Sequence, residues 1–257
     1  MYNLGLKDLV LLRLENPSVD KQYAVIDRMQ RLIDTWDKDQ DERWVFLSCY
    51  AMMTGNMLAA VEGGEFEDCE WVDALLHRFA DYYFIALESY ERGDGNTPEV
   101  WQRAFDAAQA SGTHQLQSLI LGVNAHINFD LVFALSDLLL PEWLGLSDEQ
   151  KRSRYRDHCH VNEIIFDTID RVQDQVIERD NPEMDVVDKL MGPLDEWLTS
   201  RLITAWREQV WQDATRLVDQ PQDGERQDIS AQVESRALQR TEVILGQAGI
   251  SGLIDLL

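Results

Sequence analysis

The stretch HQLQSLILGVNAHINFDLVFALSDLL, residues 114–139, decides the fold class of this chain. It lies between the helix breakers Ser111-Gly112 and Pro141, and most of its residues are Leu, Ile, Val, Ala or Phe. Apolar residues at spacings of three and four, uninterrupted by glycine-rich or proline-rich turns, are typical of a helix. The stretch therefore predicts a long helix in the protein core.

The same spacing recurs along the rest of the chain, where six prolines and fourteen glycines mark the breaks between helices. Thr97 followed by Pro98 is typical of an N-cap and a first helical turn. Ser147 followed three residues later by Gln150 is the signature of a capping box. Helices are expected over residues 25–36, 42–61, 68–90, 98–110, 114–139, 147–179, 194–218 and 228–246.

The chain is expected to form one all-α globular domain over residues 1–257, built on long core helices. No run of alternating β-branched residues bounded by turns predicts a strand, and no fixed-period repeat predicts a solenoid. The segment around 228–246 is rich in Gln, Glu and Arg. We expect residues 220–257 to form a polar helical extension that packs least closely on the core.

The charge balance is strongly acidic, with 47 Asp and Glu against 23 Lys and Arg and a net charge of −24. Such a surface repels phosphate backbones and anionic lipids. Nucleic acids and membranes are therefore not expected partners.

Cysteine usage and the N-terminus predict a cytoplasmic protein. The three cysteines, Cys49, Cys69 and Cys159, are an odd number without CxxC spacing, which fits neither a disulfide framework nor a thiolate zinc site. The first residues lack the basic region and apolar core of a signal peptide. No later run is expected to reach the ~20 apolar residues of a membrane span.

Four polar residues interrupt the apolar run of the long core helix: Asn124, His126, Asn128 and Asp130. The spacing of four places the two asparagines on one face and the histidine and aspartate on another. Burying these groups is costly unless they bond one another or a ligand. The segment therefore predicts either a functional site or a hydrogen-bond network that fixes helix packing.

Three further histidines stand one helical turn before a polar residue: His77 before Asp81, His158 before Asn162 and His160 before Glu163. A helical His-x-x-x-Asp pair can share a divalent ion, or the carboxylate can orient the imidazole as a base. With 47 acids in 257 residues, such pairs also arise by chance. The candidate metal ligands are His126, Asp130, His77, Asp81, His158 and Glu163.

Polar residues on two other apolar helices are expected to converge with His126 on one buried pocket. Tyr50 and Thr54 interrupt the apolar run 45–58, and Asn162 belongs to the polar run 157–163. Most of the eight tryptophans lie on apolar helical stripes and are expected in the core, and Trp101 is the one kept as a further pocket candidate.

The phrase Leu121-Gly122-Val123-Asn124-Ala125-His126-Ile127-Asn128-Phe129-Asp130-Leu131 resembles the hallmark of DUF5995, a bacterial family of unknown function. Weaker phrases in the same order extend the resemblance over roughly residues 25–217. These phrases are Tyr50-x-x-x-Thr54, Phe79-Ala80-Asp81-Tyr82-Tyr83, Trp101-x-x-Ala104-Phe105, Val161-Asn162-x-Ile164 and Ala205-Trp206. The resemblance implies a site and no reaction. It points to Asn124, His126, Asn128, Asp130 and Asn162, with Tyr50 and Thr54 as companions.

A more distant likeness is to the all-α zinc phospholipase C and P1 nuclease superfamily, whose helices carry His-x-x-x-Asp metal ligands. The spacing from Gly122 through His126 to Asp130 is similar. Those enzymes are secreted, use an N-terminal tryptophan ligand and carry more histidines, whereas this chain begins with Met1-Tyr2.

Three functions follow from these residues. In the first, the chain is a lyase, cyclase or isomerase type of enzyme acting on a small, partly apolar molecule. His126 is then the acid or base, Asp130 orients it, and Asn124, Asn128 and Asn162 bind substrate oxygen.

In the second function, the chain is a hydrolase of phosphoesters, and His126 and Asp130 hold a zinc, manganese or iron ion that activates water.

In the third function, the chain is a non-catalytic binding protein. The polar network is then structural, and Met52, Met53 and Met57 line an apolar groove. The sequence leaves the oligomeric state open.

Overall fold

The computed structural model describes residues 24–110, 113, 115–172, 193–220 and 223–246, and all of its regular structure there is helical. The all-α prediction is confirmed, and the helices begin and end close to the predicted positions. The predicted helix end near residue 179 lies outside the described residues. The helices are α3 Ala24–Asp39, α4 Arg43–Glu62, α5 Cys69–Arg92, α6 Glu99–Gln109, α7 Gln115–Ala125, the π-helical turn η2 His126–Asp130, α8 Leu131–Leu139, α9 Asp148–Val172, α11 Pro193–Asp219 and α12 Asp223–Leu245.

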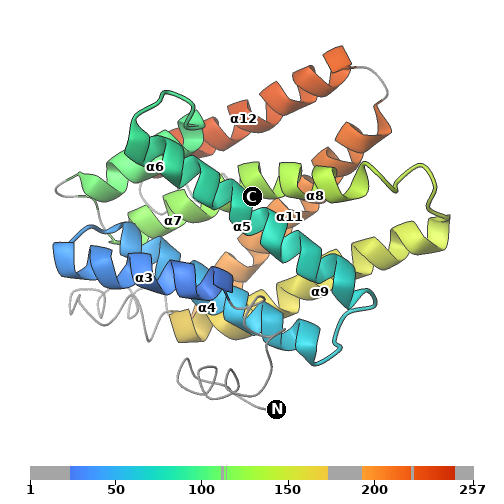
Figure 1. Ribbon diagram of the computed structural model, residues 1–257, viewed down its shortest axis with the longest axis horizontal. Helices are drawn as coiled ribbons and strands as arrows, with labels where there is room; N and C mark the ends of the chain where they lie inside the picture. Colours follow the sequence, from blue (N-terminus) through green and yellow to red (C-terminus); the bar gives the residue numbers. More distant parts are fainter. Residues whose placement is uncertain (1–23, 111–112, 114, 173–192, 221–222, 247–257) are drawn as a thin grey trace.

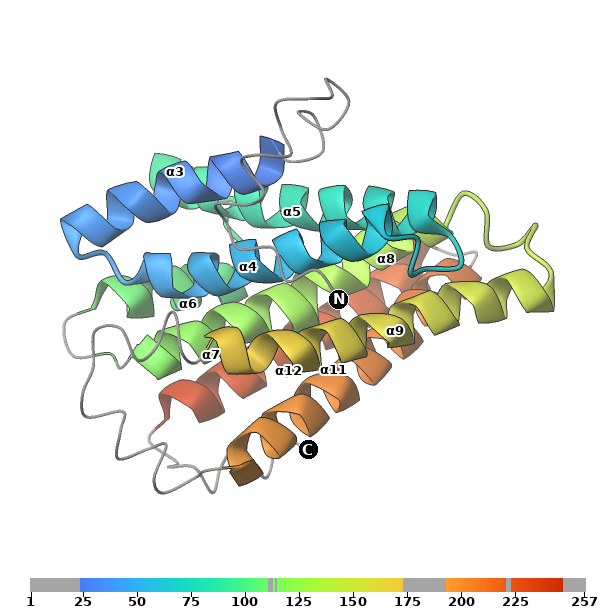
Figure 2. The ribbon, with the colours of Figure 1, turned by 90° about the horizontal axis from the view of Figure 1, so that it is seen from below.

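The long helix α7–η2–α8 runs through the middle of the bundle (Figures 1 and 2). Its first part packs against α4, α6 and α12, and its last part packs against α5 and α11. The view in Figure 2 places α3 along one edge and α11 along the opposite edge, with α7 between them. The predicted core helix is therefore surrounded by neighbours on all sides.

Two large hydrophobic clusters make up most of the core of the described part, and Ile26 and Leu58 form a small third one. One large cluster lies around α4, α5 and α6 and includes Tyr83 and Trp101, and the other lies around α8 and α11 and includes Leu135 and Trp211. Phe129 of η2 packs against both clusters. The polar residues of the central helix therefore lie where the two clusters meet.

Two helices are long and apolar enough to cross a bilayer by length and composition alone, contrary to the expectation that no run would approach that length. They are α4 and the continuous helix Gln115–Leu139. Within the most apolar windows of these helices, 67% and 72% of the residues are buried inside the bundle. Core helices of this kind meet the same criteria because their neighbours cover all their faces.

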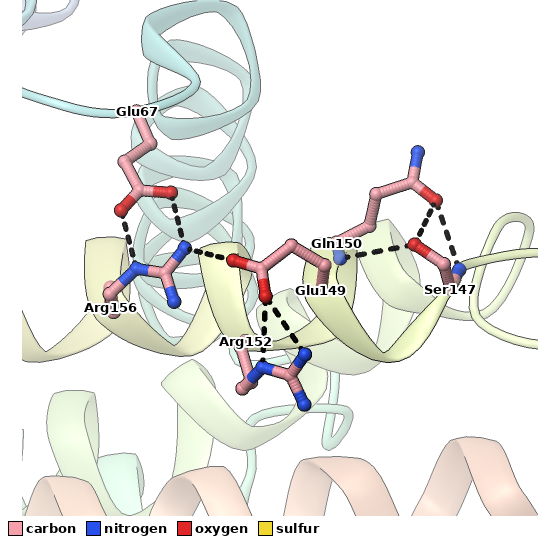
Figure 3. Close-up of polar contacts among 6 residues, drawn as sticks. All are labelled: Glu67, Ser147, Glu149, Gln150, Arg152 and Arg156. Carbon is pink, nitrogen blue, oxygen red and sulfur yellow. Dashed lines mark hydrogen bonds and ion pairs between the residues drawn. The ribbon is translucent and has the colours of Figure 1, made fainter.

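The predicted capping box at the start of α9 is confirmed. The Ser147 backbone N–H donates to Oε1 of Gln150 over 2.9 Å, and the Gln150 N–H donates to Ser147 Oγ over 3.3 Å (Figure 3). Further along α9, Arg156 forms ion pairs with Glu149 of its own helix and with Glu67 of the segment between α4 and α5. These exposed ion pairs each contribute little to stability.

A buried carboxylate makes the stronger connection between α9 and the segment before α5. Asp157 is 2% exposed, and its two oxygens accept the backbone N–H groups of Glu67 at 2.8 Å and Asp68 at 3.0 Å. Losing either bond would leave a buried polar atom without a partner, which is costly. This contact positions the following residues of α9, including His158 and Asn162.

The predicted N-cap at Thr97 was wrong by one residue. The N-cap position is Pro98, the helix α6 begins at Glu99, and no side chain caps it. The Thr97 hydroxyl instead donates to Ser89 Oγ over 3.2 Å. The Thr-Pro pattern predicted that the Thr97 side chain would cap α6, but this side chain bonds a residue of α5 instead.

The expectation that the C-terminal polar segment would pack least closely was also wrong for α12. Ile229, Val233, Ala237 and Thr241 are buried against the core, and α12 packs on α6, α7 and α11. These residues recur every four positions, so they form a narrow stripe along one face of the helix. The composition of this segment did not reveal the stripe, because the stripe has only four residues, including Ala237 and Thr241, and most of the other residues of α12 are polar.

Candidate functional site

The central helix changes from α-helical to π-helical hydrogen bonding at the polar segment. His126–Asp130 form a π-helical turn, and the backbone N–H of Leu131 donates to the carbonyl of His126, five residues earlier. Single π turns inside α-helices are rare and occur frequently at functional sites. The side chains of His126, Asn128 and Asp130 are all buried there. Nothing in the residue pattern predicts this turn.

Three buried side chains form a hydrogen-bonded chain at this turn. Nδ1 of His126 lies 3.1 Å from Oδ2 of Asp130, and the indole N–H of Trp101 on α6 donates to the same oxygen over 2.9 Å. The three residues are 3%, 1% and 1% exposed, respectively. The predicted pairing of His126 with Asp130 is confirmed, and Trp101 contacts this pair.

Aromatic rings enclose the imidazole of His126. Phe79 of α5 stacks on it with ring centroids 3.5 Å apart and planes at 8°, and Tyr50 of α4 meets it edge-on at 4.2 Å. Phe46 of α4 lies edge-on at 5.8 Å. Of these three rings only Phe79 is half-buried rather than buried. Phe79 therefore lies between the imidazole and the surface.

The other imidazole nitrogen, Nε2 of His126, is buried and has no hydrogen-bond partner among the described residues. Burial lowers the pKa of His126 well below its usual 6.5. Burial also raises the pKa of Asp130 well above its usual 3.8, although the hydrogen bond from Trp101 opposes this shift. A low-dielectric environment disfavours the charged form of each group. The site therefore favours a neutral histidine beside a carboxyl that holds its proton.

The asparagines occupy the opposite face of the same helix, as predicted. Nδ2 of Asn128 donates to Oδ1 of Asn124 over 3.0 Å. Nδ2 of Asn124 donates to the carbonyl of Ala237 over 2.9 Å and lies 3.1 Å from Oγ1 of Thr241. These bonds join the central helix to α12. The substrate-binding role expected for both residues stays a prediction.

Tyr50 and Thr54 have different surroundings. The ring of Tyr50 contacts His126, whereas the Thr54 hydroxyl donates to the Tyr50 carbonyl of its own helix over 2.8 Å. Of the two, Tyr50 is the one in ring contact with the imidazole.

His158 and Asn162 of α9 form a second cluster with Arg207 of α11, and nothing in the sequence linked them to this arginine. Oδ1 of Asn162 accepts from Nε of Arg207 over 2.8 Å, and Nε2 of His158 lies 3.0 Å from the Arg207 carbonyl. No hydrogen bond or ring contact between described residues joins this cluster to His126. Of the three helices that were expected to converge on His126, α4 and the central helix do so, whereas His158 and Asn162 of α9 contact Arg207 of α11 instead.

The other two described histidines, His77 and His160, lie near the surface in separate places. His77 pairs with Asp73 at 3.7 Å, while the predicted partner Asp81 lies within 4.0 Å of Arg78. His160 contacts Glu163 at 3.0 Å, as its spacing predicted. Within the ranges that the structure describes, no group of three or more His, Cys, Asp or Glu residues is arranged to hold a metal ion. The metal site stays a prediction.

A surface groove of about 590 Å³ lies beside the π turn, between α8 and the first turns of α12. Phe129 and Phe133 form its apolar side, and its polar side includes Arg226 and Glu234. Sequence reasoning missed this groove because it forms between segments that are far apart in the chain. It also missed Phe79 as a cover of His126, although the phrase Phe79-Ala80-Asp81-Tyr82-Tyr83 had marked this part of α5.

Comparison with known proteins gives one match. The model of a family described as "Family of unknown function (DUF5995)" matches residues 23–247, which includes α12. No curated protein and no solved structure matches the chain. The likeness to the zinc phospholipase C and P1 nuclease superfamily is therefore not supported, and a similar spacing from Gly122 to Asp130 is too short a pattern to carry it.

Proposed function

Since the chain belongs to DUF5995, a family of unknown function, its activity has to be inferred from the site, and we propose that it is an enzyme that moves a proton on a small, partly apolar molecule. His126 is the residue that exchanges the proton, through Nε2. Asp130 and Trp101 position the imidazole and tune its proton affinity.

The observation that carries this proposal is the inequality of the two imidazole nitrogens. Nδ1 is held by Asp130, whereas Nε2 is buried and no described residue bonds to it. A buried polar atom without a partner costs roughly 1–3 kcal/mol. A purely structural histidine would be expected to use both nitrogens. A base oriented on one side and free on the other is the arrangement that acid–base catalysis needs.

A proton can pass through the pair without creating a buried cation. In the form that burial favours, the carboxyl of Asp130 donates to Nδ1, and Nε2 carries a proton. When Nε2 gives its proton to a substrate atom, the carboxyl proton moves to Nδ1. The imidazole stays neutral, and a negative charge forms on Asp130, where the indole N–H of Trp101 stabilises it. In this second form Nε2 takes a proton from an acidic C–H of the substrate, Nδ1 returns its proton to Asp130, and the starting form is restored.

Access to Nε2 requires a side chain to move, and Phe79 is the one in position. It covers the imidazole face and is half-buried, whereas Tyr50 and Phe46 belong to the buried core. Rotation of Phe79 would open a space lined by aromatic rings. Such a space favours a small molecule with an apolar body and one polar reacting group.

The test is hydrogen exchange catalysed on candidate compounds in D₂O. Small carbonyl compounds with an acidic C–H are first selected by the thermal shift that they cause in the protein. Deuterium incorporation into the binders is then followed by mass spectrometry. We expect His126→Gln to slow incorporation at least ~100-fold, the usual contribution of a general acid or base.

His77→Gln is the matched control, because this half-buried histidine pairs with Asp73 and, among the described residues, makes no hydrogen bond, ion pair or ring contact with His126, Asp130 or Trp101. It should exchange at the wild-type rate. The Phe79→Ala variant should bind the same compounds with faster association, because the cover of the imidazole is removed. The proposal fails if His126→Gln, folded as judged by its melting curve, exchanges as fast as wild type.

A non-catalytic binding function has one observation in its favour, the groove that Phe129 and Phe133 line beside α12. Under this alternative, His126 and Asp130 only fix the packing of the helices. Variants of the groove such as Phe133→Ala would then abolish ligand-induced thermal shifts, and His126→Gln would leave them intact.

A further inference from the structure

A second site, independent of the proposed function, is indicated by Arg207 of α11. Its side chain is 5% exposed and lies against α9. Nη2 donates to the carbonyl of His158 over 2.7 Å and lies 3.3 Å from Nδ1 of the same residue, and Nε donates to Asn162. No described residue accepts a hydrogen bond from Nη1.

Every described partner of Arg207 is electrically neutral. The carbonyl of Arg207 can only accept, so Nε2 of His158 carries the proton and Nδ1 presents a lone pair to the guanidinium. Burial, followed by the charge of Arg207, lowers the pKa of His158 well below 6.5, which keeps this imidazole neutral. Burial lowers the pKa of Arg207 to about 10, so the guanidinium is still a cation at neutral pH.

Two other buried charged residues of the described part have ion-pair partners, and a third, Asp157, accepts two backbone N–H groups. Arg43 is paired with Asp41 at 2.6 Å, and Asp213 is paired with both Arg216 and Arg236. Arg207 has no ion pair among the described residues. A buried cation without a counter-charge is costly, and proteins place such groups where an anion binds or where they are paired.

We propose that Arg207 and Asn162 form a binding site for a small oxyanion, a carboxylate or a phosphate. The guanidinium is the side chain best suited to such groups, and its Nη1 has donors to spare. Asn162 is half-buried and connects the cluster to the surface of α9. The net charge of −24 repels anions from the rest of the surface, which limits binding elsewhere.

Thermal unfolding of the full chain in potassium phosphate and in potassium acetate tests the site. Ionic strength is held constant with KCl at pH 7. We expect the Tm to rise with the concentration of one anion, by roughly 5 °C at 100 times its Kd. A response to phosphate alone or to acetate alone identifies the class of ligand. No rise with either anion overturns the proposal.

The variant Arg207→Gln should lose this response, and Arg152→Gln, which removes an exposed arginine of α9, should keep it. An unchanged response in folded Arg207→Gln overturns the proposal. If Arg207→Gln does not fold, Arg207→Lys decides. Its ammonium group lacks the fork of the guanidinium and cannot reach Asn162, His158 and an anion from one position, so at least tenfold weaker binding supports the site and unchanged affinity overturns it.

Discussion

Two buried histidines of this chain differ in one hydrogen bond, and that bond separates their roles. Burial lowers the pKa of both His126 and His158. Both nitrogens of His158 have polar neighbours on α11, whereas Nε2 of His126 has no hydrogen-bond partner in the described part of the chain. A fully bonded imidazole stabilises a helix contact, while an imidazole with one free nitrogen retains the capacity to exchange a proton.

The bond from Trp101 to Asp130 should contribute measurably to stability. We expect Trp101→Phe to lower the free energy of unfolding by roughly 1–3 kcal/mol, because a buried carboxyl oxygen loses a donor. Urea denaturation measures this change. Trp206→Phe is the matched control, since Nε1 of Trp206 is buried without a described partner. Equal losses in the two variants would contradict a specific role for the indole N–H of Trp101.

His158 should make stability depend on pH. Its folded pKa is lowered, so below pH 6.5 the unfolded chain takes up a proton that the folded chain does not bind. Its contribution to stability is present above pH 6.5 and is lost as the pH falls. Between pH 7.5 and 5.5, wild type should lose about 1.4 kcal/mol more than His158→Gln. Urea denaturation at both pH values decides, and parallel pH profiles would refute the expectation.

At the scale of elements, close approach of two helices shapes the aromatic cage around His126. A Cβ on Gly122 of α7 would lie 2.4 Å from Cγ of Phe46 on α4. Phe46 is buried and contacts His126, so its ring has little room to retreat. The glycine is therefore required for helix packing rather than for a special backbone conformation.

Gly122→Ala should lower the free energy of unfolding by about 1–3 kcal/mol, the usual cost of overpacking a core. Gly224→Ala is the control, because a Cβ there has no atom within 4 Å, and the loss of chain entropy in the unfolded state should raise stability slightly. Chemical denaturation of both variants measures the difference. A neutral Gly122→Ala would show that α4 and α7 can separate without cost.

At the scale of the whole molecule, the donors around His126 argue for a site without a metal ion. Nδ1 is bound by Asp130, and the groups nearest to the imidazole plane are phenyl and phenol rings. We expect protein purified without chelator to contain no near-stoichiometric zinc, manganese or iron by elemental analysis. Near-stoichiometric metal that disappears in His126→Ala would contradict this and favour the phosphoester hydrolase.

Much of the candidate site was accessible from local spacing. The pairs His126–Asp130 and Asn124–Asn128 were predicted because residues four apart share one face of a helix. Asn162 was grouped with His126 because both are polar residues in apolar surroundings, and the structure instead places it beside Arg207. Which neighbour a polar side chain meets depends on how helices pack, and local spacing carries no information about that.

The sequence by itself determined the helices, their breaks and the buried polar residues of the central helix, since periodicity, capping and turn residues act within a few positions of one another. Only the tertiary structure decided that Trp101 and Phe79 meet His126, that α12 packs on the core, and that Arg207 is buried among neutral partners. These contacts join residues far apart in the chain. They depend on shape complementarity between helix faces, which no single helix encodes.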